Sequence, residues 1–438
     1  MSEVHAETTR FVRTEMVAQQ APPITEKGAV KWVRENLFSG WLNVLLTVVS
    51  LFVIYAVLSA LLPWFANSVW TADSLDGCRE VLAEKGLSGH GGACFSVITE
   101  RWNQLIFGFY PPELYWRPIL AFVVFLLGIA PVLFQGTPRR ALWGSIAAPF
   151  IVYWLIWGGS LWGPILTAAG FGVGAASFIL AARLAGNIPG VLAAILLPVL
   201  YWMFLVGPLV SGFAAILPLE ITKIESNDIG GFMLALIIGI SGIILSLPLG
   251  ILLALGRQSH LFIITKVSVA FIEVIRGVPL IVWLFTASLL LNYFLPPGTD
   301  FDLMLRVIIM VTLFASAYIA EVVRGGLAAL PKGQYEAADA LGLDYAKSMR
   351  LIILPQALKI SIPGIVNTFI GLFKDTTLVV FIGLLDPIGL TNAIRSTTAW
   401  NGIYWELFIF IGLMFFIFCY SMGRYSIYLE KKLQREHR

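Results

Sequence analysis

The chain has 438 residues, of which 58% are hydrophobic and 13% are charged, and its mean hydropathy is +0.85. Soluble domains carry roughly 25% charged residues, so the composition excludes a soluble domain and indicates a polytopic membrane protein. The net charge of +3 is spread over loops and tails, which argues against nucleic-acid binding, and the sequence has no Walker-type phosphate loop, HExxH or CxxC motif, so we expect neither catalytic residues nor a metal site.

The N-terminal part of the chain combines a tail, an apolar run and a long polar loop. Residues 1–40 are polar and basic and predict a cytoplasmic tail, because they are too charged for the start of a secretory signal. Residues 43–65 are apolar over the roughly 20 residues that cross a bilayer. The loop that follows covers residues 67–116. In it, Cys78 and Cys94 flank a glycine-rich stretch that is expected to face an oxidising compartment, so the two cysteines could form a disulfide or remain two free thiols.

Further apolar runs predict an all-α membrane protein with about ten transmembrane helices. The later expected spans are residues 118–134, 144–162, 164–182, 188–206, 230–255, 266–294, 304–324, 360–385 and 405–428. The sixth span, residues 230–255, is interrupted by Pro248. If one N-terminal pair were re-entrant or interfacial, about eight spans with the same sidedness would remain. Most of the 29 lysines and arginines then lie on the inner side, so the positive-inside rule predicts two cytoplasmic termini.

A polar segment, residues 331–356, stands out among these apolar runs and must lie outside the bilayer. Residues 335–341 have the composition of a short helix, and Gly342 can end that helix in the left-handed conformation. Residues 344–354 predict a second helix that ends at Pro355. Two short helices that meet at a glycine would form a compact projection.

This segment resembles the cytoplasmic EAA loop of ABC importer permeases. Its fixed spacing is met by Glu336, Ala337, Ala338, Gly342, Ile352, Leu354 and Pro355. An ordinary amphipathic loop helix is the alternative, although seven positions at fixed spacing favour the family. The resemblance implies that this loop is a coupling element that docks on a separate ATPase subunit, with Glu336 offering charge-assisted hydrogen bonds and the two alanines allowing close approach.

Two Glu-x-x-Arg-Gly sequences place charges within expected spans. Glu273 and Arg276 are three residues apart, as are Glu321 and Arg324, so each pair could meet on one helix face and lower its own burial cost. We interpret Glu321 and Arg324 mainly as a structural ion pair at the base of the loop. Glu273 and Arg276 lie deeper, before Pro279, and could form either a structural pair or part of a substrate pathway.

Lys374 and Asp375 lie near the middle of the ninth expected span, followed by Thr376 and Thr377. Adjacent helical residues point about 100° apart, so at least one charge should reach another helix or an aqueous cavity. A zwitterionic amino acid needs an acceptor for its ammonium group and a donor for its carboxylate, and this cluster offers both. A substrate-pathway role and a structural role remain equally open.

The C-terminal half resembles the permease family for polar amino acids, the histidine, glutamine and arginine importer group. The similar stretches are residues 230–232, 246–250, 271–280, 321–326 and 374–378. The resemblance implies a five-helix permease core at residues 230–428, with the coupling loop 331–356 inside it, a membrane extension at residues 41–229 and a cytoplasmic tail at residues 429–438. The extension makes the chain similar to a permease of the general L-amino-acid, or glutamate/glutamine/aspartate/asparagine, uptake systems of alpha-proteobacteria.

By this resemblance the chain is a non-enzymatic subunit in a bacterial inner membrane, surrounded by lipid. A periplasmic binding protein would deliver an L-amino acid to it and to a second, homologous permease, and two ATPase subunits would hold ATP and magnesium, so no cofactor is expected in this chain. An ion-coupled secondary amino acid transporter is the alternative, with Glu273 and Asp375 as coupling sites. The coupling-loop signature argues against it.

Overall fold

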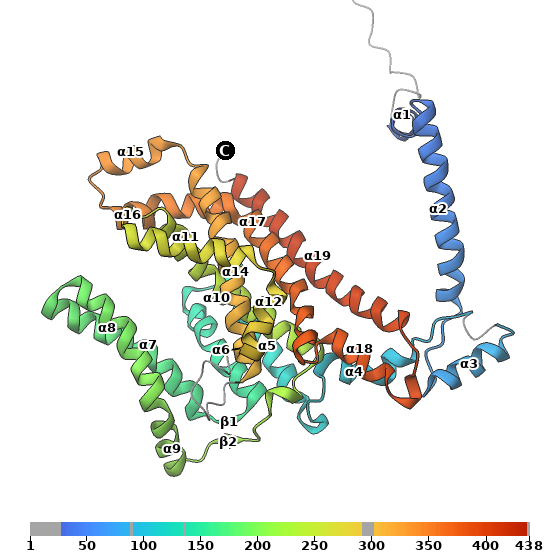
Figure 1. Cartoon of the computed structure of the whole chain (residues 1–438), viewed down its shortest axis with the longest axis horizontal. Coiled ribbons are helices and arrows are strands. Elements are labelled where there is room, and N and C mark those ends of the chain that lie inside the picture. Colours follow the sequence, from blue (N-terminus) through green and yellow to red (C-terminus); the bar gives the residue numbers. More distant parts are fainter. Residues whose placement is uncertain (1–27, 88–90, 135, 291–301, 436–438) are drawn as a thin grey trace, which may run out of the picture. The chain divides into compact units, whose positions relative to one another are not determined.

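The structure, a computed structural model, describes most of the chain, and nearly all of it is helical (Figure 1). The described residues are 28–87, 91–134, 136–290 and 302–435. Parts of the expected N-terminal tail, seventh span and C-terminal tail lie outside these residues. The chain divides into two units, which are Met1–Val69 with Arg79–Ala93, and Trp70–Cys78 with Cys94–Arg438.

The first unit contains α1 (Gly28–Asn36) and the single apolar helix α2 (Trp41–Ala66), none of whose side chains is buried. Two backbone hydrogen bonds tie its later segment to the end of α2. The Ala93 N–H donates to the Trp64 carbonyl at 2.9 Å, and the Val69 N–H donates to the Ala93 carbonyl at 2.8 Å.

The second unit is organised around four long helices, α10 (Gly231–Arg257), α14 (Leu303–Ala328), α17 (Leu354–Asp375) and α19 (Trp405–Arg435). Neighbours among them pack directly, α10 on α14, α14 on α17, and α17 on α19 (Figure 1). The end of this unit with α4 (Ser96–Phe107) and the first residues of α10, α14 and α19 is called the disulfide end. The opposite end, where α10 and α14 finish, is called the coupling-loop end.

Glycines set how closely these helices approach each other. A Cβ on Gly242 of α10 would meet Val311 of α14 and Leu372 of α17, and a Cβ on Gly250 would meet Ile319. Small residues allow such close packing in lipid, where hydrophobic association between helices is weak. These contacts fix the relative depth of α10, α14 and α17.

The seventh expected span is bent sharply at Pro279, the proline that lies within it. α11 (Phe262–Gly277) meets the segment Leu280–Leu290, which begins with α12 (Leu280–Phe285), at an angle of 101°. Val278 is extended, with φ −123° and ψ 136°, as expected for a residue before a proline, because the Pro279 ring disfavours the helical conformation there. α12 continues as the π-helical segment η6 (Thr286–Leu290).

Two other prolines do not interrupt the helices that contain them. α10 runs through Pro248, so the expected interruption of the sixth span is absent, consistent with the tolerance of transmembrane helices for proline. The expected end of the second loop helix at Pro355 was also wrong. α16 (Tyr345–Ser348) leads through the π-helical segment η7 (Met349–Ile353) into α17, where Pro355 occupies the first turn, a position that tolerates its missing N–H.

The remaining elements complete the extension and the ends of the bundle. They are α3 (Leu75–Glu84), η2 (Pro112–Leu114), α5 (Trp116–Leu133), η3 (Arg139–Ala141), α6 (Leu142–Trp157), β1 (Gly159–Ser160), α7 (Trp162–Ala185), α8 (Asn187–Leu200), η4 (Tyr201–Leu205), α9 (Val206–Ile216), β2 (Glu220–Ile221), η5 (Ser226–Asp228), α15 (Lys332–Ala340), η8 (Thr376–Ile382), α18 (Pro387–Arg395) and η9 (Thr398–Trp400). Strands β1 and β2 pair antiparallel.

A buried arginine holds the α5–α6 hairpin together at the disulfide end. Arg117 is 1% exposed. Its Nε donates to the Leu155 carbonyl at 2.7 Å and its Nη1 donates to the Thr222 carbonyl at 2.8 Å. Leu155 lies in the last turn of α6, where carbonyls have no intrahelical partner and the helix dipole favours a cation. Arg117 therefore joins α5, α6 and the segment after β2.

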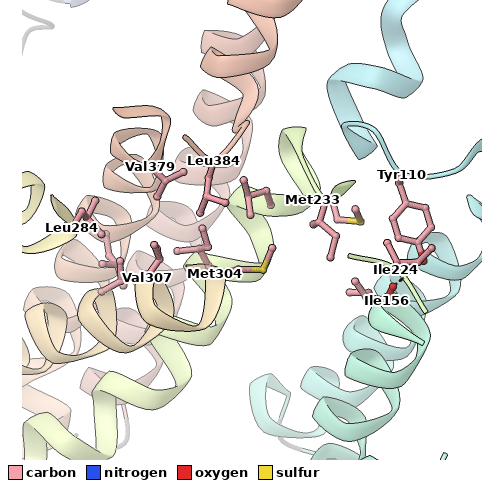
Figure 2. Close-up of a cluster of buried hydrophobic side chains, with 14 of the residues drawn as sticks. Tyr110, Ile156, Ile224, Met233, Leu284, Met304, Val307, Val379 and Leu384 are labelled. Atoms are coloured by element: carbon pink, nitrogen blue, oxygen red, sulfur yellow. Dashed lines mark hydrogen bonds between the residues drawn. The ribbon is translucent and has the colours of Figure 1, made fainter. Parts of the chain in front are cut away.

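A hydrophobic cluster connects the extension to the core at the same end (Figure 2). Tyr110, Ile156 and Ile224 come from the extension and Met233 from α10, and the Tyr110 hydroxyl donates to the Ile156 carbonyl at 2.9 Å. Leu284, Met304 and Val379 continue the cluster among the core helices. The extension is therefore attached to the core by packed side chains at the disulfide end.

The number of membrane-spanning helices agrees with the expectation of about ten. Among the described residues, nine helices are long and apolar enough to cross a bilayer, and the bent pair α11–α12 raises this number to ten. The all-α fold class and the approximate span count are therefore confirmed.

Candidate functional site

The segment with the EAA pattern forms two short helices that meet at a glycine, as predicted. α15 ends at Ala340, and Gly342 has φ +69°, a conformation that costs glycine little. Asp344 then caps α16, because its Oδ1 accepts a hydrogen bond from the Lys347 backbone N–H at 2.8 Å. This hydrogen bond holds the pKa of the Asp344 carboxyl below its ordinary value.

The two alanines of the loop do not play the same part in the structure. Ala337 and Glu336 are exposed, whereas Ala338 is fully buried and its carbonyl accepts a hydrogen bond from the Leu343 N–H at 3.2 Å. Of the two alanines expected to allow close approach of a partner, only Ala337 is therefore at the surface, and Ala338 packs inside the loop and holds its shape.

Sequence reasoning missed two large side chains beside the glycine turn. Leu341 is 73% exposed and Tyr345 is 61% exposed. Large apolar or aromatic side chains are frequent anchors at protein interfaces. Their signal was present in the sequence, since both interrupt a polar segment within three residues of Gly342.

The loop is firmly packed onto α14 and α17. Leu327 of α14, Met349 and Ile353 of η7 and Ala357 of α17 are buried in one cluster, against which Tyr335 of α15 packs. The Gln356 amide also donates to Gln334 Oε1 at 3.1 Å. Leu354 is half-buried and Pro355 is exposed at this junction. A force on the loop would therefore act directly on both helices.

Glu321 is the centre of a charged cluster at the coupling-loop end. Its Oε1 accepts a hydrogen bond from Arg257 Nη1 at 2.6 Å, and its Oε2 accepts one from Arg324 Nη2 at 3.0 Å. Arg276 Nη1 lies 3.7 Å from the same Oε2. The Glu321 side chain is 17% exposed. Three cations from α10, α11 and α14 therefore share one partly buried carboxylate.

Glu273 and Arg276 do not form the expected pair with each other. Glu273 Oε1 lies 3.1 Å from Arg257 Nη1, while Arg276 approaches Glu321 and lies over the Tyr318 ring at 5.4 Å. Both therefore bind residues of neighbouring helices. The i, i+3 spacing identifies partners on one helix only, and here other helices offer closer ones.

The expectation that Glu273 and Arg276 lie deep in the membrane was also wrong. Ile264, Ser268 and Glu273, which span most of α11, all approach the last two residues of α10, Gly256 and Arg257. α11 therefore crosses the end of α10 instead of running along it. Its charges lie at the depth where α10 finishes, and the bend at Pro279 directs α12 back along α14.

Lys374 and Asp375 lie closer to the disulfide end than the expected middle of the span. They are the last residues of α17, and the side chains of Phe373 and Thr376 pack near Gly239, which is roughly 12 Å from the start of α10 at 1.5 Å per residue. α17 changes to the 3₁₀ segment η8 immediately after Asp375. Helix length alone did not reveal this early ending.

The polar groups at this point are two hydroxyls that are hydrogen-bonded to backbone carbonyls and two charged side chains that remain available to a ligand. The Thr376 hydroxyl donates to the Phe373 carbonyl at 2.8 Å, and the Thr377 hydroxyl donates to the Lys374 carbonyl at 2.9 Å. Thr376 is 1% exposed, Asp375 is half-buried and Lys374 is exposed. The geometry therefore favours Lys374 and Asp375 over the two threonines as groups that could meet a ligand.

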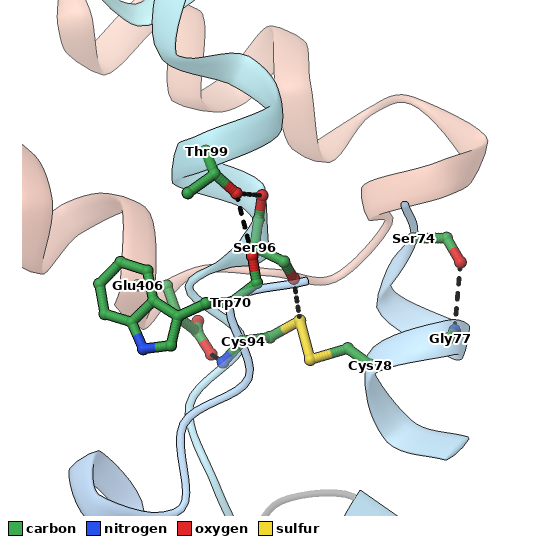
Figure 3. Close-up of a disulfide and its surroundings, with 8 residues drawn as sticks. All are labelled: Trp70, Ser74, Gly77, Cys78, Cys94, Ser96, Thr99 and Glu406. Atoms are coloured by element: carbon green, nitrogen blue, oxygen red, sulfur yellow. Dashed lines mark hydrogen bonds between the residues drawn. A yellow bond between two sulfur atoms is a disulfide. The ribbon is translucent and has the colours of Figure 1, made fainter. Parts of the chain in front are cut away.

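Cys78 and Cys94 are joined in a disulfide (Figure 3). Cys419 is the remaining cysteine. The Cys94 backbone N–H donates to Glu406 Oε1 at 2.9 Å, and Cys94 Sγ and Ser96 Oγ are 3.2 Å apart. Glu406 is buried at the start of α19. It links the polar loop to the core, and no sequence signal pointed to it.

No group of three or more metal-binding side chains occurs among the described residues. The arrangement instead supplies a rigid exposed projection at one end of a helical bundle, a shared carboxylate at its base, and two charges towards the other end.

Known proteins resemble this chain over part or all of its length. Residues 246–435 match the family "Binding-protein-dependent transport system inner membrane component". The glutamate/glutamine/aspartate/asparagine transport system permease protein BztC of Rhodobacter capsulatus is 55% identical over 98% of this chain and 99% of its own length. The inner membrane amino-acid ABC transporter permease protein YhdY of Escherichia coli is 40% identical over 92% of this chain and 93% of its own length.

A crystal structure of an amino acid ABC transporter with histidines matches 45% of this chain and 90% of the matched chain, at 31% identity and a TM-score of 0.41. The resemblance inferred from the sequence motifs is confirmed by the two full-length relatives.

Proposed function

Because the chain belongs to the amino-acid ABC permeases, within the family of inner membrane components of binding-protein-dependent transport systems, we propose that it forms half of the membrane pathway of an ATP-driven amino acid importer. The observation that supports this most directly is the exposed projection of α15, Gly342 and α16, packed on α14 and α17. A transporter driven by an ion gradient needs no such contact for an ATPase.

The proposed assembly contains this chain, a second homologous permease, two ATPase subunits and a periplasmic binding protein. Each permease would present one coupling loop to one ATPase, and the single loop of this chain fits such a heterodimer. ATP and magnesium would be held by the ATPases. Leu341 and Tyr345 would be the apolar anchors of the contact, and Glu336 would supply a charge-assisted hydrogen bond.

The orientation follows from this contact. With the coupling-loop end in the cytoplasm, the disulfide end faces the periplasm, and both termini are cytoplasmic. Cys78 and Cys94 are then in an oxidising compartment, where a disulfide persists. The distribution of lysine and arginine supports the same orientation.

In the proposed mechanism, closure of the ATPases moves the coupling loop together with the buried cluster at its base. α14 and α17 would move with it, because Leu327 and Ala357 belong to that cluster. Glu321 would pass the movement to α10 and α11, since Arg257 and Arg276 share its carboxylate. The bend between α11 and α12 is where such a movement could change access to the pathway.

Lys374 and Asp375 would contact the substrate in this pathway. An amino acid carries an ammonium group and a carboxylate, and these two side chains provide one partner for each. The substrates proposed are polar L-amino acids such as glutamate, glutamine, aspartate and asparagine, which are the ones in the name of the Rhodobacter capsulatus relative.

Purification of the tagged chain from its native membrane in mild detergent tests the proposal. We expect an ATPase and a second permease to co-purify, and Glu336→Lys to release the ATPase while the second permease stays bound. Amino acid uptake should persist under an uncoupler and stop on ATP depletion. A folded chain that purifies alone, or uptake that stops with the uncoupler, would overturn the proposal in favour of an ion-coupled carrier.

A further inference from the structure

A large, half-open cavity lies between the extension and the core of the second unit. Its volume is about 1240 Å³, and its walls come mainly from α5, α6, α10 and the start of α14. Apolar side chains dominate the lining, among them Phe125 and Ile129 of α5, Val152 of α6 and Ile240 of α10. The cavity is larger than the ~300–1,000 Å³ of typical small-molecule sites.

Two attachments hold the α5–α6 hairpin to the core at opposite ends of this cavity. At the disulfide end, Ile156 of α6 and Met233 of α10 pack in the shared cluster. At the other end, the Tyr425 hydroxyl of α19 donates to the Leu133 carbonyl at the end of α5, at 2.8 Å. The lining runs along α5 from Pro118 to Val132, a distance of roughly 21 Å, so the helices separate between the two attachments.

The cavity lies at the depth of the hydrocarbon, because its walls are parts of helices that qualify as membrane spans. Water is poorly accommodated by an apolar lining, and an empty space of this size would forfeit dispersion contacts along its whole surface. A polar amino acid would leave its charged groups without partners on these walls. Hydrocarbon chains would fill this space and make apolar contacts with its walls.

The mouth of the cavity at the disulfide end carries balanced charge. Lys223, Glu225, Asp302 and Arg306 all belong to the lining there. Lys223 Nζ lies 3.5 Å from Glu225 Oε1, and both side chains are largely exposed. A cation and a carboxylate side by side match a headgroup that carries both a phosphate and an ammonium group, whereas an anionic headgroup would complement only the two cations.

We propose that this cavity binds the acyl chains of a zwitterionic phospholipid, with its phosphate at Lys223 and its ammonium group at Glu225. The lipid completes the packing between the extension and the core, where protein side chains leave a gap. The proposal is independent of the transported substrate and of the coupling loop.

The first experiment measures retained lipid. The full chain with its co-purifying subunits is extracted from its native membrane in mild detergent, washed, and analysed for bound phospholipid by mass spectrometry. We expect phosphatidylethanolamine to be retained in preference to phosphatidylglycerol. Ile240→Trp, which fills the cavity from α10, should lower the retained lipid at least fivefold. The matched control Leu252→Trp changes an exposed residue of the same helix outside the lining and should leave retention unchanged.

The mouth is tested by Lys223→Glu, which should lower retention of phosphatidylethanolamine severalfold. A preference of the unsubstituted chain for phosphatidylglycerol would overturn the assignment of a zwitterionic headgroup. Equal retention by the chain with and without Ile240→Trp would overturn the site itself.

A second measurement needs no substituted chain and so does not depend on the folding of a variant. Phosphatidylethanolamine with a photoactivatable acyl chain is incorporated into membranes that hold the intact complex, and crosslinked peptides are mapped. We expect peptides from residues 118–132 and 232–244 to be enriched over the exposed face of α8, Asn187–Leu200. Equal labelling of these segments would overturn the proposal.

Discussion

Arg257 Nη1 lies 2.6 Å from Glu321 Oε1, and this contact joins the last turn of α10 to α14 beside the coupling loop. Because Arg276 and Arg324 approach the same carboxylate, Glu321 offsets the mutual repulsion of three cations. Its removal therefore has consequences that removal of a peripheral charge does not.

Glu321→Gln should destabilise the protein by about 1–3 kcal/mol, less than the ~3–5 kcal/mol for one partner of a fully buried pair, because the side chain retains 17% exposure. Glu273→Gln is the matched control, since Glu273 also binds Arg257 but is 56% exposed, and we expect less than about 1 kcal/mol. Thermal unfolding of both variants in the same detergent measures the difference. Equal shifts would show that Glu321 is not the centre of the cluster.

The coupling loop should bind its partner through the side chains that flank Gly342. Leu341→Ser and Tyr345→Ser should each reduce co-purification of the ATPase by roughly tenfold, an effect expected for interface anchors. Thermal stability should stay unchanged, because both side chains are exposed. Asp339→Ser, another exposed position on α15, is the control, and loss of the ATPase in this variant as well would argue against specific anchors.

The sequence predicted the features that depend on local chemistry. Gly342 follows α15 in the left-handed conformation, as predicted, and each expected apolar run is found in a helix or in the bent pair, although several helices extend beyond the expected bounds. Features set by contacts between helices were not predictable. Glu273 binds Arg257 from α10, and residue spacing along one helix contains no information about a partner on another.

The bend at Pro279 is a second feature that the sequence alone could not predict. The proline was visible in the sequence, yet proline bends the chain here and leaves α10 continuous at Pro248. The outcome depends on neighbours, because α11 crosses the end of α10, where Glu273 contacts Arg257, whereas α12 packs against α14. Glu406 is another example, since its partner is the backbone N–H of Cys94, more than 300 residues earlier.

Asp375→Asn should lower amino acid uptake by roughly tenfold or more with little change in thermal stability. The reason is that neither Asp375 nor Lys374 has an ion pair to another helix among the described residues, and a charge at bilayer depth needs a partner or a function. Thr377→Val is the control, because that hydroxyl donates to the Lys374 carbonyl three residues earlier. Parallel losses of uptake and stability for Asp375→Asn would leave only a structural role.

The disulfide should stabilise the polar loop. It closes a loop with a sequence separation of 16 residues, so Cys78→Ser should destabilise the loop by on the order of 2–3 kcal/mol. Labelling of the native protein without reductant should detect Cys419 alone, and reductant should add two thiols. In the Cys419→Ser variant, any labelled thiol comes from Cys78 or Cys94. Two reactive loop thiols before reduction would contradict the bond.

Asp386 should make the stability of the protein depend on pH. It lies outside the membrane spans, caps α18 through a 2.9 Å hydrogen bond from the Gly389 N–H to Oδ1, and leaves Oδ2 buried without a partner. Burial raises the pKa of its carboxyl from 3.8 to about 6, although backbone hydrogen bonds oppose this shift. The folded protein therefore holds the proton more tightly than the unfolded chain does.

It follows that the contribution of Asp386 to stability is fully present below about pH 3.8 and is lost as pH rises to about 6. The total change is at most about 3 kcal/mol, since each unit of pKa shift corresponds to about 1.4 kcal/mol. Asp386→Asn keeps an oxygen for the Gly389 N–H but cannot ionise, so the difference in thermal stability between it and the unsubstituted protein should change across pH 4–6 and stay constant above pH 7. A difference that is independent of pH throughout this range would show that the carboxyl titrates normally.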